Sequence, residues 1–240
     1  MSKTLVVVVP DADTLAATVA SRLIAKIVDA QAERGSAGVV LTGGRIAKRV
    51  LAALKELPEA KAIDWAHLDL WWGDERFLPA GDPERNETQA REALLDALPL
   101  DPARVHPMPA SDGPDGDDAE AAATRYAAEL GATLPPFDVL MLGVGEDGHV
   151  ASLFPEHPVL NETGSTTAAV HDSPKPPPTR ITLTLPAIRN AQEVWLIAAG
   201  PEKADSVGAA LSGDEALQAA RATGTLRTVW LLDAAAAAKR

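Results

Sequence analysis

The stretch FDVLMLGVGEDGH, residues 137–149, indicates how this chain folds. Its first half, Phe137 to Leu142, is a short apolar run that predicts a β-strand. The glycines at 143, 145 and 148 follow at once, which indicates a sharp turn of the backbone or its close approach to another group. The stretch therefore predicts a strand that ends in a glycine-rich loop.

Similar apolar runs occur on both sides of this stretch. They predict strands at Leu5–Val9, Val39–Leu41, Leu68–Trp72, Val194–Ala198 and Val229–Leu232. The run Leu5–Val9 is rich in β-branched residues, which is typical of a strand buried on both faces.

Helical patterns separate these strands. Leu15, Val19, Leu23 and Ile27 recur every four residues, after a helix cap at Asp11 or Asp13 and before Gly35. Two more helical segments are expected, from Gly43-Gly44 to about Leu57 and over Glu87–Leu98. The alternation of strand and helix predicts an α/β fold in which helices cover both faces of a parallel sheet.

Composition and charge narrow the class of protein. The chain has 240 residues, of which 46% are hydrophobic and 23% charged, so we expect one globular domain over residues 1–240. It has no cysteine, which excludes disulfides, thiolate metal sites and cysteine nucleophiles. A net charge of −12 disfavours nonspecific binding to nucleic acid or anionic membranes. No apolar stretch reaches about 18 residues and no signal peptide is seen, so we expect a cytoplasmic protein.

Three of the predicted loops leave carboxyl ends of strands. They are Gly43-Gly44, residues 73–85 and the loop after Leu142. Because ligands of open α/β sheets bind at this edge, we expect these loops to converge on one site.

The loop Gly143–Gly148 matches the dinucleotide pattern G-x-G-x-x-G, but we reject that interpretation. Glu146 and Asp147 would lie where a pyrophosphate needs positive potential. Pro155 and Pro158 leave no room for the long helix that would follow.

His149, which follows this loop, is the best candidate for a general base. Imidazole titrates near neutral pH, and Asp147, two residues earlier, could orient the ring. A structural role for His149 remains the alternative, and the histidines at 67, 106, 157 and 171 are expected to be structural or at the surface.

Three further groups are candidates for binding an anion. Arg76 in the run WWGDER (71–76) could bind an oxyanion or carboxylate. Asp74 could hold the Arg76 guanidinium in place or contact substrate hydroxyls. The turn Thr42-Gly43-Gly44-Arg45 could bind phosphate at a helix start, or could be a tight turn only. Arg180 and Lys203 are either surface cations or part of the same phosphate site.

Several motifs of other classes are missing. The sequence contains no H-E-x-x-H, no G-x-S-x-G and no Walker pattern, so zincins, serine esterases of the α/β-hydrolase type and nucleoside triphosphate chemistry are unsupported. The acidic run at 111–120 lacks EF-hand spacing and is interpreted as a solvated loop with a helix cap. The prolines of SPKPPP (173–178) exclude a helix or a central strand there.

Taken together, six segments resemble the 6-phosphogluconolactonases, a family related to glucosamine-6-phosphate deaminase. They are LTGG (41–44), WWGDERFLP (71–79), RNETQAREALL (85–95), FDVLMLGVGEDGHVASLFP (137–155), SPKPPPTRITLTLPAI (173–188) and GPEKADSV (200–207). The resemblance implies a single-domain, modified Rossmann-like fold of three layers, α/β/α, with a mostly parallel sheet.

The resemblance also implies an activity and a set of site residues. The reaction is hydrolysis of 6-phospho-D-glucono-1,5-lactone in the oxidative pentose phosphate pathway, without a cofactor or a metal. The family's catalytic groups correspond to His149, Asp147, Asp74 and Arg76. Its phosphate-binding groups correspond to Thr42, Gly43, Gly44, Arg180 and Lys203, and Arg45 could add charge. His149 would activate water, and Arg76 would stabilise the oxyanion or the new carboxylate.

Two departures from the family pattern concern the binding segments. Arg45-Ile46-Ala47 follows the Gly-Gly turn directly, and Arg85-Asn86 stands where Ser-Asn is common, with Asn86 expected to keep its local role.

Two other functions remain open. The first is a sugar-phosphate isomerase–deaminase on the same scaffold, which would need an extra acid to open the sugar ring. The second is a sugar-phosphate sensor without catalysis, although there is no room before the first strand for a DNA-binding helix-turn-helix. For the lactonase interpretation we expect a monomer that binds a small-molecule sugar-phosphate lactone, with no nucleic-acid or membrane partner.

Overall fold

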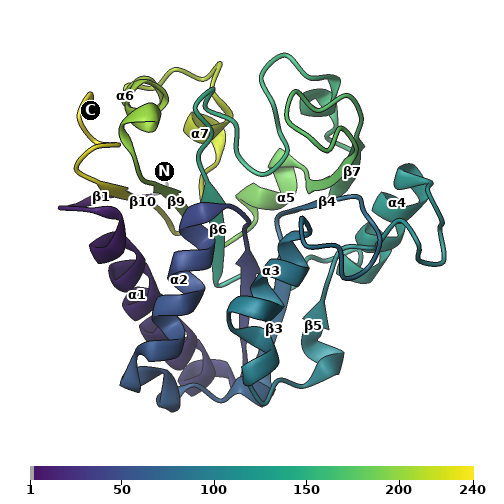
Figure 1. Ribbon diagram of the computed structural model, residues 1–240, viewed down its shortest axis with the longest axis horizontal. Coiled ribbons are helices and arrows are strands. Elements are labelled where there is room, and N and C mark those ends of the chain that lie inside the picture. The colour runs from purple at the N-terminus through teal and green to yellow at the C-terminus, as the bar shows by residue number, and fades with distance from the viewer. Residues whose placement is uncertain (1–2) are drawn as a thin grey trace.

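The computed structural model describes residues 3–240, and a parallel β-sheet forms its centre (Figure 1). Within these residues the sheet has seven strands in the spatial order β1-β10-β9-β6-β2-β3-β5, and every pair of neighbours runs parallel. The strands are β1 (Lys3–Val9), β2 (Ala37–Leu41), β3 (Leu68–Trp72), β5 (Val105–His106), β6 (Val139–Gly143), β9 (Glu193–Ala198) and β10 (Arg227–Asp233).

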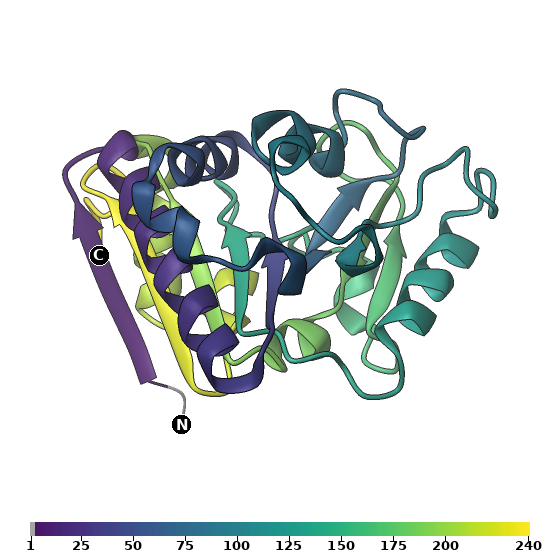
Figure 2. The same ribbon diagram turned by 90° about the horizontal axis from the view of Figure 1, so that it is seen from below.

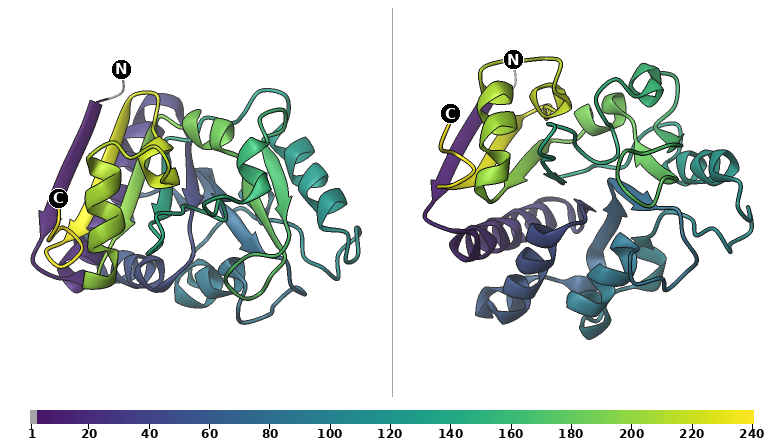
Figure 3. Two further views of the ribbon diagram at one scale, coloured as in Figure 1. Left: turned by 90° about the horizontal axis from the view of Figure 1, so that it is seen from above. Right: turned by 45° about the horizontal axis from the view of Figure 1, so that its top comes forward.

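Helices cover both faces of this sheet (Figure 3). On one face lie α1 (Ala12–Arg34), α2 (Arg45–Glu56) and α3 (Asn86–Ala93), and on the other lie α5 (Leu185–Arg189), α6 (Ala204–Leu211) and α7 (Gln218–Arg221). The predicted α/β/α arrangement is thereby confirmed.

Helix α1 shows how the local sequence sets an element. Asp11 is its N-cap and accepts a hydrogen bond from the backbone N–H of Thr14 at 2.8 Å. The predicted stripe from Leu15 to Ile27 is buried against the sheet. Gly35 ends the helix in the left-handed region, with φ of 79°, and its N–H bonds to the Gln31 carbonyl.

A second, smaller sheet lies beside the first and was not predicted. It is antiparallel, in the order β4-β8-β7, and its strands are β4 (Asp74–Arg76), β8 (Arg180–Leu183) and β7 (Thr167–Val170). Helix α4 (Ala119–Leu130) lies against β7 and β8, at the end of the molecule opposite β1 (Figure 2). Asp118 caps α4, in agreement with the cap expected in the acidic run.

Two details of the sequence interpretation are wrong. Leu5–Val9 is half-buried rather than buried on both faces, because β1 is an edge strand that pairs only with β10. The helix expected over Glu87–Leu98 ends at Ala93, and a 3₁₀ turn at Leu95–Ala97 follows. This break turns Leu94 and Leu95 into the core, where they are 2% and 4% exposed.

The strand order reverses between β2 and β6. From β2 the chain builds outward through β3 to β5, and from β6 it builds the other way through β9 to β10, which lies beside the first strand, β1. Loops after strands on the two sides of such a reversal leave in opposite directions and open a crevice. Here that crevice lies between the loops after Leu41 and Gly143.

Candidate active site

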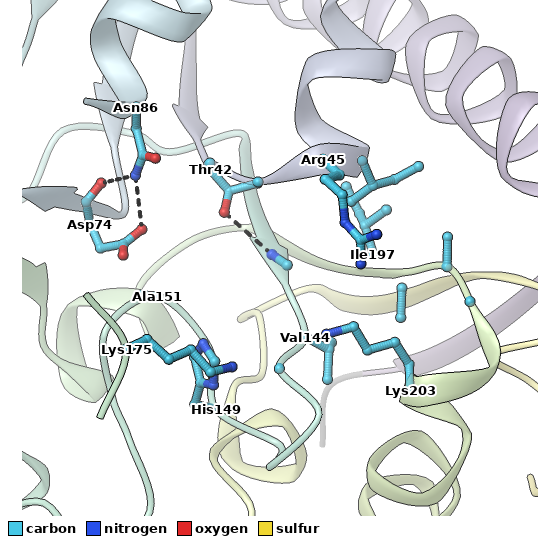
Figure 4. Close-up of a pocket in the computed structure, with 18 of the residues that line it drawn as sticks. Thr42, Arg45, Asp74, Asn86, Val144, His149, Ala151, Lys175, Ile197 and Lys203 are labelled. Atoms are coloured by element: carbon cyan, nitrogen blue, oxygen red, sulfur yellow. Dashed lines mark hydrogen bonds between the residues drawn. The ribbon is translucent and has the colours of Figure 1, made fainter. Parts of the chain in front are cut away.

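The crevice holds a pocket of about 620 Å³ (Figure 4). The three loops that were expected to converge all contribute to its lining. Nine of the ten site residues predicted from the sequence line it, namely Thr42, Gly43, Gly44, Arg45, Asp74, Arg76, His149, Arg180 and Lys203. The tenth, Asp147, lies behind His149 and bonds to it.

His149 is held on three sides. Its Nδ1 lies 2.5 Å from Asp147 Oδ1, and its ring packs on Phe154 at 4.6 Å between centroids. A Cβ on Gly145 would lie 2.0 Å from His149 Nδ1, so only glycine leaves room for the imidazole. Gly148, with φ of 76°, supplies the left-handed turn that returns the chain to His149.

The contact with Asp147 defines which ring nitrogen can act as a base. Burial raises the pKa of the Asp147 carboxyl, but the hydrogen bond from His149 and the charges of His149 and Lys175 outweigh it. The pKa therefore lies well below its usual value. An ionised carboxylate accepts a hydrogen bond, so Nδ1 carries a proton, and Nε2 is the ring nitrogen left to exchange a proton with water.

Asp74 is buried at the start of β4 and is fixed by two donors. Ser152 Oγ donates to its Oδ2 at 2.7 Å, and Asn86 Nδ2 donates to its Oδ1 at 3.5 Å and to its backbone carbonyl at 2.8 Å (Figure 4). A Cβ on Gly43 would lie 1.9 Å from Asn86 Oδ1, so Asn86 also fills the space beside the Gly-Gly turn. Asn86 thus has a local structural role, as expected.

Glu75, between Asp74 and Arg76, turns away from the pocket. Its carboxylate accepts hydrogen bonds from the backbone N–H groups of Arg76, Asn86 and Glu87 at 2.8, 2.6 and 2.9 Å. It therefore ties β4 to the first turn of α3. Burial raises the pKa of Glu75 to about 7, against the charge of Arg85 and these hydrogen bonds.

The departure at Arg85 has a structural explanation. Its side chain is 1% exposed and lies 3.8 Å from Glu75 and 3.2 Å from Glu87. Its Nη atoms also donate to the carbonyls of Leu78, Met108 and Pro109. Arg85 thus secures the segment after β4 and does not reach the pocket.

The Thr42–Gly44 turn has the features of an anion site. Gly44 is the N-cap of the twelve-residue α2, and the first turn of that helix contains no acidic residue. Its free N–H groups and the helix dipole favour an anion there. Thr42 Oγ1 accepts a hydrogen bond from Gly143 N at 3.3 Å, which joins the loops after β2 and β6.

Two cations flank this turn. Arg45 is 87% exposed and pairs with Glu202 Oε1 at 2.9 Å across the mouth of the pocket. Lys203 extends into the pocket from the loop after β9 (Figure 4), and burial lowers the pKa of its ammonium group.

Arg180 is buried at the start of β8, and its guanidinium binds backbone. Nε donates to the Pro177 carbonyl at 3.2 Å, and Nη2 donates to the carbonyls of Lys175 and Pro176 at 3.0 and 2.9 Å. Within residues 3–240, Nη1 makes no hydrogen bond, and Arg180 is one of the residues that line the pocket.

The pocket concentrates positive charge in an acidic protein. Six cationic side chains line it within the described residues, against the three carboxylates of Asp74, Glu202 and Asp233. The cations are Arg45, Arg49, Arg76, Lys175, Arg180 and Lys203. Since the whole chain has a net charge of −12, the pocket differs from the rest of the molecule by its excess of cations, which favours an anion there.

Sequence reasoning missed Arg49, Lys175 and Glu202 as pocket residues. Arg49 lies one helical turn after Arg45, so the spacing of four could have indicated it. Lys175 lies in the proline segment, whose composition excludes regular structure but gives no direction for its side chain. Glu202 was not predicted because the cation of its neighbour Lys203 is the more obvious ligand for a phosphate.

Other features of the described chain lie away from this pocket. The histidines that were expected to be structural have local partners, and they are His67, His106, His157 and His171. Residues 3–240 contain no group of three histidine, aspartate or glutamate side chains placed to bind a metal. Nor does any helix in that range have the length and apolar character needed to span a membrane.

Fold and site together define an α/β protein of the doubly wound type, with a pocket rich in cationic side chains at its switch point. Comparison with known families gives the particular family. The model described as "Glucosamine-6-phosphate isomerases/6-phosphogluconolactonase" matches residues 10–230, and this chain belongs to that family.

Individual relatives agree with this assignment. A curated protein of Streptomyces coelicolor named 6-phosphogluconolactonase is 63% identical over 95% of this chain and 92% of its own length. One of the same name from Mycobacterium tuberculosis is 48% identical over 96% of each chain. The solved structure titled as 6-phosphogluconolactonase from Trypanosoma brucei has a TM-score of 0.86 and 27% identity, over 99% of both chains.

Proposed function

We propose that this chain hydrolyses 6-phospho-D-glucono-1,5-lactone to 6-phospho-D-gluconate, a step of the oxidative pentose phosphate pathway. The observation that carries the proposal is one pocket with an imidazole–carboxylate pair and an anion-binding helix start. The curated relatives that carry the name of this activity match the chain over nearly their whole length. The chain is an ester hydrolase of this family.

His149 acts first as the general base. Its Nε2 takes a proton from water while the water oxygen attacks the lactone carbonyl carbon. The protonated imidazole then gives that proton to the ring oxygen as the ester bond breaks. Asp147 orients the ring and stabilises its charged form. Such positioned proton transfer contributes roughly 10²–10⁴-fold to the rate.

The β4 end of the pocket binds the reacting part of the substrate. Arg76 stabilises the oxyanion or the carboxylate that forms from it. Ser152 and Asn86 hold the Asp74 carboxylate in place. Its remaining lone pairs accept hydrogen bonds from the sugar hydroxyls.

The α2 end binds the phosphate. The Thr42–Gly44 turn supplies backbone N–H groups, and Arg45 and Lys203 supply charge on either side. Arg180 contributes the N–H donors of its guanidinium Nη1. Fixing the phosphate holds the lactone in place beside His149, which raises its effective concentration there.

The proposal is tested by supplying purified protein with the lactone, made in situ from glucose 6-phosphate by a dehydrogenase. We expect hydrolysis to be accelerated strongly over a control without the protein, and no ammonia to be released from glucosamine 6-phosphate. Ammonia release without lactone hydrolysis would favour the isomerase–deaminase function. Binding of both compounds without turnover would favour a sensor.

A further inference from the structure

Lys175 is a pocket residue with no role in the mechanism above. Its Nζ lies 3.9 Å from Asp147 Oδ1, the same oxygen that bonds to His149 Nδ1. Its side chain is 45% exposed, and Figure 4 shows it extending toward the imidazole. The ammonium group therefore lies beside the residue proposed as the general base.

The backbone around Lys175 is held by a set of hydrogen bonds. The buried guanidinium of Arg180 binds the carbonyls of Lys175, Pro176 and Pro177 in succession. Ser173 Oγ donates to the Lys175 carbonyl at 2.9 Å and accepts from the Lys175 N–H at 3.3 Å.

Burying the Arg180 guanidinium loses much of its hydration, and its hydrogen bonds to three successive carbonyls offset that loss and fix their positions. Prolines on both sides of Lys175 restrict the backbone further. The loop is therefore a rigid support that presents one flexible cation to the pocket.

Arg76, the oxyanion donor named above, lines the pocket from β4 but is partly engaged by the protein, so there is room for a second donor. Its Nη1 donates to the Glu84 carbonyl at 2.6 Å, in the turn that follows β4. Among the lysines and arginines of the described residues, only Lys175 lies within ion-pair distance of Asp147.

We propose that Lys175 is a catalytic residue, whose ammonium group donates a hydrogen bond to the lactone carbonyl oxygen as negative charge develops there. This inference rests on the proposed lactone hydrolysis. Water adds to the carbonyl carbon, its proton passes to His149 Nε2, and the carbonyl electron pair moves to the oxygen that Lys175 contacts. When the carbonyl re-forms, the ring C–O bond breaks and His149 protonates the ring oxygen. Lys175 stays protonated throughout and is regenerated unchanged.

The test compares Lys175→Met, Lys175→Arg and the wild type in steady-state hydrolysis of the lactone. Lys55→Met, at the exposed last turn of α2, is the matched control. Because the Lys175 side chain is half-exposed, its variants are expected to fold, which a thermal melt checks. Loss of one oxyanion donor costs roughly 10²–10³-fold in rate. We therefore expect kcat of Lys175→Met to fall by about that factor, with KM within about threefold of the wild type and partial recovery in Lys175→Arg.

Two results would overturn the inference. One is a kcat of Lys175→Met within about threefold of the wild type and of Lys55→Met. The other is a large rise in KM at unchanged kcat, which would place Lys175 with the phosphate instead. If the wild type itself does not accelerate hydrolysis, the proposed function fails, and this outcome is distinct from both.

Discussion

Gly145 illustrates how closely single residues are matched in the pocket. A methyl group there would overlap the imidazole of His149 and the carboxylate of Asp147. We expect Gly145→Ala to displace the ring and to lower kcat by at least about 100-fold, since small misplacements of catalytic groups have effects of this size. Gly164→Ala is the control, because a Cβ there makes only an ordinary contact. Equal activity of the two variants would show that the ring tolerates displacement.

At the scale of single residues, the sequence predicts which residue types form the site better than it predicts where their side chains point. His149 could be found because a glycine loop at a strand end precedes it, and Asp147 because it is two residues away. Lys175 could not be found, since its direction depends on Arg180 and the proline backbone. The burial of Glu75 and Arg85 was also hidden, because a run of charged residues is usually solvated.

The junction of β4 and α3 depends on the protonation of Glu75. Its pKa is raised by burial to about 7, above the value near 4.5 of an exposed glutamate. The folded state therefore binds more protons than the unfolded state between these values, and the free energy of unfolding falls as pH rises through this window. We expect this fall to be smaller in Glu75→Gln.

Urea unfolding at several pH values between 4.5 and 8 measures this effect. Glu59→Gln, which removes an exposed carboxylate, is the control and should follow the wild type. If Glu75→Gln shows the same pH dependence as the wild type, Glu75 titrates at the same pH in both states.

Elements were predicted well where their pattern is local and long. The strands Leu68–Trp72 and Val194–Ala198 and the helix after Asp11 are examples. The strands of the second sheet could not be predicted, because they have three or four residues each. Strand β4 forms only by pairing Asp74–Arg76 with β8, whose residues lie more than one hundred positions away. The edge position of β1 likewise depends on the order of all seven strands of the larger sheet in residues 3–240, which a run of valines does not reveal.

Across the whole molecule, cationic side chains gather in the pocket although the net charge of the chain is negative. A pocket rich in cations within a chain of net charge −12 attracts an anionic substrate only when it is close to the site. We expect kcat/KM to fall several-fold between low salt and about 0.5 M salt, because salt screens the pocket from a phosphorylated substrate. The value of kcat should change little. A kcat/KM that is independent of salt would contradict a binding role for these cations.

The predicted convergence of loops was confirmed at the same scale, because parallel strands carry their carboxyl ends to one edge. The central claim is that this edge hydrolyses a lactone through His149. The most direct test is the rate of lactone hydrolysis by His149→Ala beside the wild type, with circular dichroism showing that both are folded. The account predicts a loss of roughly 10²–10⁴-fold in kcat. A His149→Ala protein within about threefold of the wild-type rate would contradict it.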